Sequence, residues 1–197
     1  MKNTNTLFKA LTAGFIIAVV FSMAGFGAEM EDIQGKVVRL HVLANSDSKY
    51  DQDIKLKVKD RVFALATELT ASCESPEEAE SVLKNNIDII GAEANQALRD
   101  LSAPYTATAQ VVEDYFSTRE YDTFTLPAGE YSALRVNLGE GKGHNWWCAV
   151  YPAVCASACA DFDGFTESEK EKVTEKEKYR IEFKFYEIYR NFLRWVS

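Results

Sequence analysis

The chain has two histidines, and each lies close in sequence to another group that can do chemistry. His41 stands six residues before Asp47, and His144 stands four residues before Cys148. Imidazole is the side chain used most often for proton transfer or metal ligation near neutral pH. If the fold unites His41, Asp47 and His144, they could act as a base with its orienting carboxylate, or as metal ligands. The alternative is that each histidine only holds a loop in place through hydrogen bonds.

Three alternating glycines precede His144, in the run Gly139 to Gly143. A phosphate-binding loop carries Ser or Thr after Gly-Lys and leads into a helix, whereas a strand pattern follows here. A tight turn or a close backbone approach explains the glycines more simply, so we expect no bound cofactor. Cys148 is a further candidate, as a nucleophile that His144 activates, provided that the segment between them stays extended.

The first 28 residues have the layout of a secretory signal. Lys2 and Lys9 precede an apolar stretch from Ala10 to Ala28 that carries no charge, which is the order of a signal peptide. Small residues at Ser22 and Ala24 predict cleavage after Ala24, with a poorer alternative after Gly27. The other interpretation is that residues 7–28 stay in place as an N-terminal membrane anchor. In both cases the remainder is extracytoplasmic.

Residues 29–197 suit a single domain with a sizeable core, since about 170 residues remain. The chain has a formal charge of −8, which becomes −10 without Lys2 and Lys9, with 20 basic against 30 acidic side chains. This acidity disfavours nucleic acid and anionic lipid surfaces as partners. We therefore expect membrane contact only through an uncleaved N-terminal segment.

The four cysteines permit disulfides, because their number is even and the chain carries an export signal. Cys148 and Cys155 flank a short segment and form the candidate pair, while Cys73 and Cys159 complete the set. The spacings do not form the paired CxxC pattern of a zinc site. Buried free thiols are the alternative.

Hydrophobic periodicity predicts an α+β domain with a mostly antiparallel sheet of four to five strands. Two helices that begin after Ser48 and Ser75 are expected to pack as a pair on the sheet, the second reaching Leu101. A C-terminal helix is expected over 168–195. The segments with strand character are 37–44, 105–116, 119–126, 131–138 and 146–151.

Unusual polar and aromatic residues gather near two predicted strand ends. Trp146 and Trp147 place one indole on each face of their strand, and an exposed tryptophan is typical of protein contacts. The alternative is a strand that is buried on both faces. The candidate partner-binding residues are Asn45, Ser46, Asp47, Lys142, His144, Asn145, Trp146 and Trp147.

Several of these blocks resemble the stage II sporulation protein R family. The similar segments are Val38 to Asp47, Gln52 to Asp60, Phe124 to Tyr131, Leu134 to Val136, Gly139 to Cys148, Tyr151-Pro152 with Cys155, and Arg180 to Phe185. The resemblance spans residues 36–195 and is strongest in the run Gly139 to Cys148. The segment from Ala156 to Thr174 is less similar, and Cys159 has no matching position.

The resemblance implies a signalling protein of endospore-forming bacteria. Such a protein is made in the forespore and exported into the space between two membranes. There it activates a membrane-embedded aspartic protease of the mother cell, which processes the precursor of sporulation sigma factor E. The family supplies no catalytic residues to carry over. The competing hypothesis is an extracytoplasmic hydrolase or metal-dependent enzyme that uses His41, Asp47 and His144, with Cys148 as a further candidate.

Overall fold

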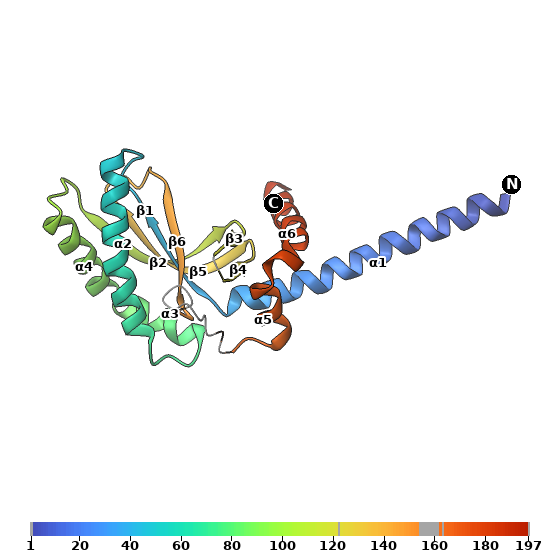
Figure 1. The fold of residues 1–197 in the computed structure, drawn as a ribbon, viewed down its shortest axis with the longest axis horizontal. Coiled ribbons are helices and arrows are strands. Elements are labelled where there is room, and N and C mark those ends of the chain that lie inside the picture. Colours follow the sequence, from blue (N-terminus) through green and yellow to red (C-terminus); the bar gives the residue numbers. More distant parts are fainter. Residues whose placement is uncertain (1, 122, 154–161, 163, 197) are drawn as a thin grey trace.

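A four-stranded mixed sheet forms the centre of the fold (Figure 1). The computed structural model describes the backbone of residues 2–121, 123–153, 162 and 164–196, and their side chains except for residues 2–8, 15–24 and 176. The strands lie in the order β2 (Ala107–Phe116), β5 (Gly129–Leu138), β1 (Val38–Leu43) and β6 (Asn145–Tyr151). The β1–β5 pair is parallel and the other two pairs are antiparallel. The expected α+β class is confirmed.

Three helices cover one face of the sheet: α2 (Lys49–Thr70), α3 (Pro76–Asn85) and α4 (Ile87–Asp100). Their buried side chains join Leu40 and Val42 of β1 in the first hydrophobic cluster. The predicted helix starts are confirmed, because the Ser48 and Ser75 side chains accept hydrogen bonds from the backbones of Asp51 and Glu78. Parallel pairing of β1 with β5 requires such a crossover between the two strands.

The other face is covered by segments from both ends of the chain and by two short strands from its middle. These are the end of α1 (Lys2–Gly35), the short strands β3 (Arg119–Glu120) and β4 (Thr125–Leu126), and the helices α5 (Glu167–Thr174) and α6 (Lys176–Val196). Met30, Ile33, Phe116, Tyr131 and Phe183 are all buried in this second hydrophobic cluster. The cluster therefore depends on residues from opposite ends of the sequence.

Three predicted elements are divided in the structure. The expected helix from Pro76 breaks at Asn86, whose side chain donates to the Val82 carbonyl. The C-terminal helix breaks at Glu175, where φ −86° and ψ 55° leave the helical region. The expected strand 119–126 is a hairpin of β3 and β4 outside the main sheet. The Tyr121 N–H closes its turn by donating to the Phe124 carbonyl.

Helix α1 continues across the predicted boundary at residue 28 and is fastened to the body by its last turns. Gln34 donates to the Ala128 carbonyl and to the Tyr186 hydroxyl, both at 3.1 Å. Lys36 forms an ion pair at 2.8 Å with the buried carboxylate of Glu169. Phe26 makes edge-to-face ring contacts with Phe183 and Tyr186. Cleavage after Ala24 would leave all of these contacts in place, whereas cleavage after Gly27 would remove Phe26.

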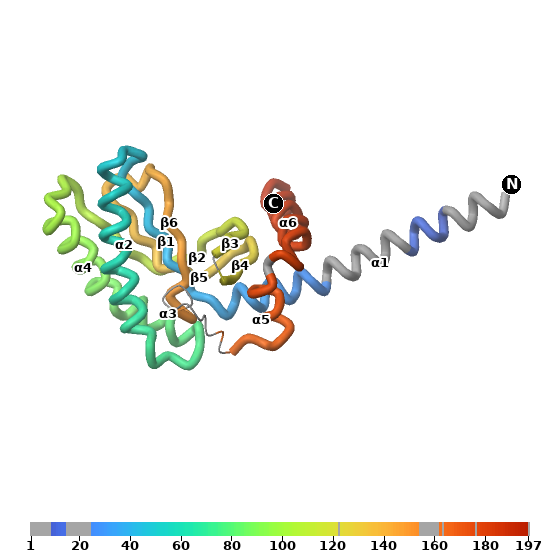
Figure 2. Tube along the Cα trace, in the orientation of Figure 1, coloured from blue at the N-terminus to red at the C-terminus, as the bar shows by residue number. Residues whose placement is uncertain are grey.

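Helix α1 leaves the body of the protein (Figure 1), and its residues 9–14 lie well away from the sheet and the other helices (Figure 2). In the part of the chain that the structure describes, no helix combines the length and hydropathy needed to cross a bilayer.

We expect the end of α1 to contribute to the stability of the domain. Ile33 is fully buried, so Ile33→Ala should lower the free energy of unfolding by about 2–5 kcal/mol through lost burial and a residual cavity. Leu11→Ala is the matched control, because Leu11 lies on the same helix and is 65% exposed. Denaturant unfolding of the full chain measures both. Equal stability of the two variants would show that α1 does not belong to the domain.

Candidate functional site

Two loops meet at the end of the sheet where β1 ends and β6 begins. We call residues 44–48 and 139–144 the paired loops. The backbone N–H of Gly143 donates to the Ala44 carbonyl at 2.9 Å, and that of Glu140 donates to Asn45 Oδ1 at 3.0 Å. These bonds hold the glycine loop against the chain that leaves β1.

The glycines of this run permit the close approach of the two loops. A Cβ at Gly143 would lie 2.2 Å from the Ser46 carbonyl oxygen, which is a backbone atom. Gly139 has φ +56°, and a Cβ there would lie 2.2 Å from Asn45 Oδ1. Close backbone approach therefore explains Gly143, whereas a positive φ and contact with the Asn45 side chain explain Gly139.

The Asp51 carboxylate, in the first turn of α2, stabilises the paired loops through hydrogen bonds. It is buried and accepts hydrogen bonds from Ser46 Oγ at 2.5 Å, Tyr105 Oη at 2.7 Å and Asn45 Nδ2 at 2.9 Å. Burial opposes ionisation of this group, but the hydrogen bonds outweigh it and lower the pKa of Asp51. The loop conformation is thus fixed by a buried carboxylate.

His144 lies on the ordered glycine loop, and its side chain is exposed to solvent. Asp47 Oδ1 accepts the backbone N–H of His144 at 2.6 Å and lies 2.5 Å from the ring Nδ1. The His144 side chain is 80% exposed and the Asp47 side chain is 57% exposed. The hydrogen bonds from the His144 side chain and backbone lower the pKa of Asp47. The buried ammonium of Lys55 donates to the His144 carbonyl at 3.0 Å. An oriented, exposed imidazole of this kind is suited to contact with a partner.

His41 lies in a different environment, on the second face of the sheet. Its Nδ1 is 2.6 Å from Asp114 Oδ2 of β2, and its ring contacts the rings of Phe116 and Trp147. Only 6% of the residue is exposed, and Nε2 is buried with no hydrogen-bond partner among the described residues. Burial lowers the pKa of His41, which favours the neutral ring, against the opposing effect of Asp114.

The structure does not bring the two histidines into one site. His41 is paired across the ladder with Trp147, and His144 lies three residues before Trp147 in the chain, or about 10 Å away at the rise of a strand. Each imidazole has its own carboxylate, Asp114 for His41 and Asp47 for His144. Among the described residues, no group of three or more His, Cys, Asp or Glu side chains could hold a metal ion.

The two tryptophans and Cys148 also separate. Trp146 packs with the first cluster and lies under the Lys59 ammonium, whereas Trp147 packs with the second cluster and lies under Arg119. One flat partner surface cannot cover both indoles. Cys148 is buried and disulfide-bonded, so it carries no thiolate. Cys155, its predicted partner, lies outside the described residues, as does Cys159, and Cys73 is a free thiol.

Sequence reasoning missed the buried cation beside His41. The Arg39 guanidinium is fully buried, lies 4.1 Å from the Phe116 ring centre, and donates to Tyr121 Oη at 2.7 Å. Its Nε and Nη1 have no hydrogen-bond partner among the described residues. Arg39 and His41 are polar residues at alternate positions of an otherwise apolar strand, which was the available signal. No local pattern pointed to Asp114 as the partner, because it lies 73 residues from His41 in the chain.

We expect His41 to make stability depend on pH. A histidine whose pKa is lowered by folding binds protons more readily when unfolded, so stability is present above about pH 6.5 and is lost as the pH falls. In the His41→Gln variant, the free energy of unfolding should fall less steeply between pH 7 and pH 5 than in the wild type. This holds whatever the substitution does to stability at pH 7. His144→Gln is the control, because that ring is exposed. Urea unfolding at several pH values over this range measures the free energy of unfolding. If its pH dependence in His41→Gln equals that of the wild type, His41 is not the group responsible.

Gly143→Ala should lower the free energy of unfolding by about 1–3 kcal/mol, because the new methyl group must displace the Ser46 backbone. Gly91→Ala, in α4, is the control, since its Cβ would make only an ordinary contact at 3.9 Å; it should be neutral or stabilising. Thermal unfolding of both variants measures the difference. A Gly143→Ala variant as stable as wild type would show that the paired loops can move apart at little cost.

Comparison with known proteins places these features in context. The family model described as stage II sporulation protein R (spore_II_R) matches residues 34–161. Stage II sporulation protein R of Bacillus subtilis (strain 168) is 31% identical over 149 residues, which cover 76% of this chain and 66% of the relative. No solved structure matches the chain. The paired loops lie within the matched range, as do His41 and its neighbours Asp114, Phe116 and Trp147. Helices α5 and α6 lie beyond it.

Proposed function

Because the chain belongs to the stage II sporulation protein R family, we propose that it is an exported signalling protein that activates a membrane-embedded aspartic protease. Family membership supports a role in sporulation. The finer proposal is that the protease then processes the precursor of sporulation sigma factor E. In this proposal the paired loops contact the extracytoplasmic surface of the protease.

The His144–Asp47 pair is the observation that carries this proposal. The pair is exposed, yet both of its loops are fixed by the buried groups Asp51 and Lys55. A surface that is already ordered loses little conformational entropy when a partner binds. No nucleophile joins the pair through a contact among the described residues, which favours recognition over catalysis.

The geometry also refines the contact surface expected from the sequence. Lys142 is 75% exposed and lies on the same loop as His144, whereas Trp147 lies on the second face with His41. We therefore centre the contact on Asp47, Lys142 and His144. The end of α1 supports cleavage after Ala24, because a domain released there retains Phe26 and the buried turns that follow.

A hydrolase is the second candidate, and one observation favours it. The His41–Asp114 pair has the arrangement of a base with its orienting carboxylate, and Nε2 has no partner among the described residues. Phe116 and Trp147 enclose the ring, however. If the protein acts as a hydrolase, the His41→Gln variant should lose signalling activity but should still bind the protease.

The test is co-expression of the full chain with the protease and the sigma factor precursor in a host that lacks all three. Asp47→Ala with His144→Ala should reduce co-purification with the protease, and precursor processing, by about tenfold or more, as expected for a contact at the centre of an interface.

The matched control is Arg61→Ala with Asp100→Ala, an ion pair between α2 and α4. It should leave both readouts unchanged. Wild-type co-purification of the Asp47/His144 variant, with the fold intact by circular dichroism, would overturn the proposed surface.

A further inference from the structure

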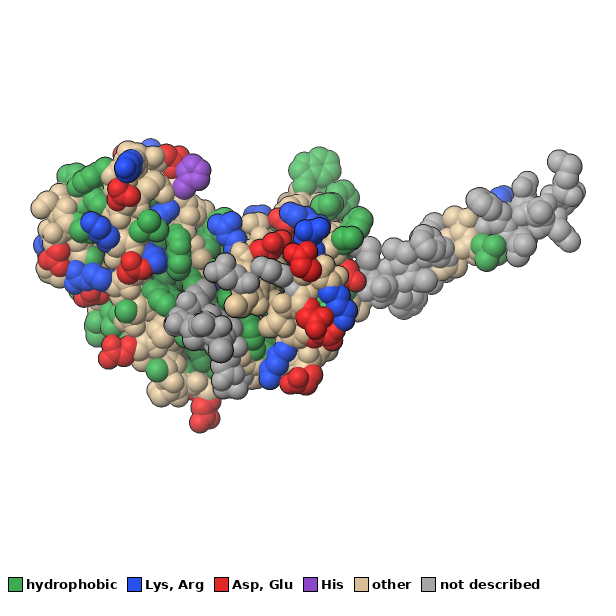
Figure 3. All heavy atoms as spheres, viewed as in Figure 1, with side chains coloured by type: hydrophobic (Ala, Val, Ile, Leu, Met, Phe, Trp, Pro, Cys, Tyr) green, Lys and Arg blue, Asp and Glu red, His purple; other side chains and the backbone are tan. Residues whose placement is uncertain are grey.

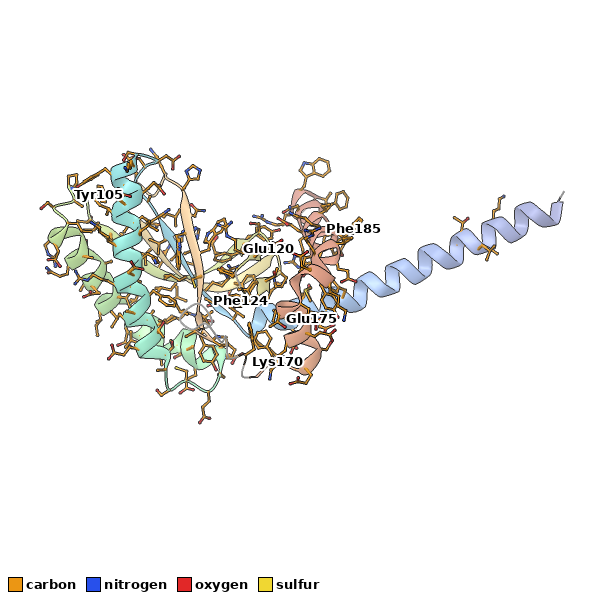
Figure 4. The ribbon with its side chains drawn as sticks, in the orientation of Figure 1. Tyr105, Glu120, Phe124, Lys170, Glu175 and Phe185 are labelled. Atoms are coloured by element: carbon orange, nitrogen blue, oxygen red, sulfur yellow. The ribbon has the colours of Figure 1, made fainter. Side chains whose placement is uncertain are left out.

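Helix α6 is apolar on two opposite faces. Phe183 and Tyr186 are buried in the second hydrophobic cluster. On the outer side lies a row of five apolar side chains that are 57–82% exposed, which we call the outer stripe: Ile181, Phe185, Ile188, Phe192 and Trp195. Figure 3 shows hydrophobic side chains gathered along this helix, and Figure 4 shows Phe185 pointing away from the sheet.

The body holds α6 in this orientation. The Arg190 guanidinium pairs with Glu31 of α1 at 3.2 Å, and the Tyr115 hydroxyl of β2 donates to Asn191 Oδ1 at 2.8 Å. The inner aromatic face is already filled by Phe26 of α1. The outer stripe therefore cannot turn inward, and a contiguous apolar surface of this kind marks an interaction site.

The charge of α6 differs from that of the rest of the chain. The helix has six basic and three acidic side chains, in a protein whose formal charge is −8. Lys184 and Arg180 flank the outer stripe and are 70% and 61% exposed. Each forms an ion pair at 3.6 Å within the helix, Lys184 with Glu187 and Arg180 with Glu177. Because charges are screened beyond about 8 Å at physiological salt, a bound surface would sense these local cations more than the net charge.

The position of α6 also favours a membrane over other partners. The apolar stretch of α1 leaves the body beside α6 (Figure 1), and Phe26, within that stretch, contacts Phe183 of α6. Three of the five side chains of the outer stripe are aromatic, and the last of them is Trp195. Aromatic residues on one face, with Lys and Arg beside them, are typical of helices that lie in the plane of the bilayer interface.

We propose that α6 is an interfacial helix that lies on an anionic bilayer surface. The outer stripe enters the headgroup region, and Arg180 and Lys184 contact lipid phosphates. This goes beyond the proposed signalling role and does not depend on it. It gives the domain a membrane affinity that survives cleavage of the signal, and it replaces the expectation from net charge that anionic lipid is a poor partner.

A second copy of the chain is the main competing occupant, because the stripe spacing of four and three residues also fits a helix pair. Pairing two copies of α6 would bring together two helices with an excess of positive charge. The charge thus opposes this arrangement, and the oligomeric state is a separate outcome of the test.

The test uses the full chain with vesicles of phosphatidylglycerol and phosphatidylcholine, and with vesicles of phosphatidylcholine alone. The fluorescence of Trp195 is obtained as the difference in tryptophan emission between the wild type and the Trp195→Phe variant. Brominated lipids in the mixed vesicles should quench this difference signal. This readout is local to α6, so binding through α1 does not obscure it.

The stripe variant is Phe185→Ser with Ile188→Ser and Phe192→Ser, which should lose Trp195 quenching and bind about tenfold or more weakly. Leu56→Ser with Ile89→Ser is the matched control, because both residues are exposed apolar positions elsewhere. Arg180→Gln with Lys184→Gln should reduce the preference for phosphatidylglycerol. Unquenched Trp195 in vesicle-bound wild type would overturn the proposal. So would a dimer in sedimentation that the stripe variant converts to a monomer without changing vesicle binding.

Discussion

The buried carboxylate of Asp51 is the interaction on which the arrangement of the paired loops depends. It lies in the first turn of α2, where the helix dipole favours a negative charge, and it accepts bonds from Ser46, Asn45 and Tyr105. It therefore links the end of β1, the start of α2 and the segment that leads into β2. Removing the carboxylate would leave its buried donors without a partner, which costs more than the loss of one hydrogen bond. The position of the exposed His144–Asp47 pair therefore depends on this buried carboxylate.

The two faces of the sheet differ in the elements that cover them and in the polarity of their buried side chains. The first face is covered by α2, α3 and α4, which all lie within the range that matches the family. The second face carries the polar residues Arg39 and His41 among aromatic rings, and it is closed by α1, α5 and α6. Since α5 and α6 lie beyond the matched range, the outer stripe of α6 belongs to a part of this chain that the family model does not describe.

Local signals in the sequence predicted the helix starts after Ser48 and Ser75, because a helix cap depends on neighbouring residues. The breaks at Asn86 and Glu175 were missed, since the helical pattern runs on across both positions. Alternation in 119–126 could not show whether the segment joins the main sheet or pairs with itself. For the site, the sequence predicted the glycine loop and a contact between Asp47 and His144, which the structure contains. It did not predict that His41 would pair with Asp114 instead of joining them. The His41–Asp114 contact joins residues 73 positions apart and is set by the strand order.

The interlocked ends of the chain also set the order in which the protein can mature. Gln34 and Tyr186, which meet in a hydrogen bond, are 152 residues apart. The second cluster needs Met30 and Ile33 from one end and Phe183 from the other. A chain that emerges from its N-terminus, during synthesis or through a translocation channel, can assemble the helix-covered face first. It cannot close the second face until α6 has emerged, so the second cluster stays incomplete while the segments before it are already available.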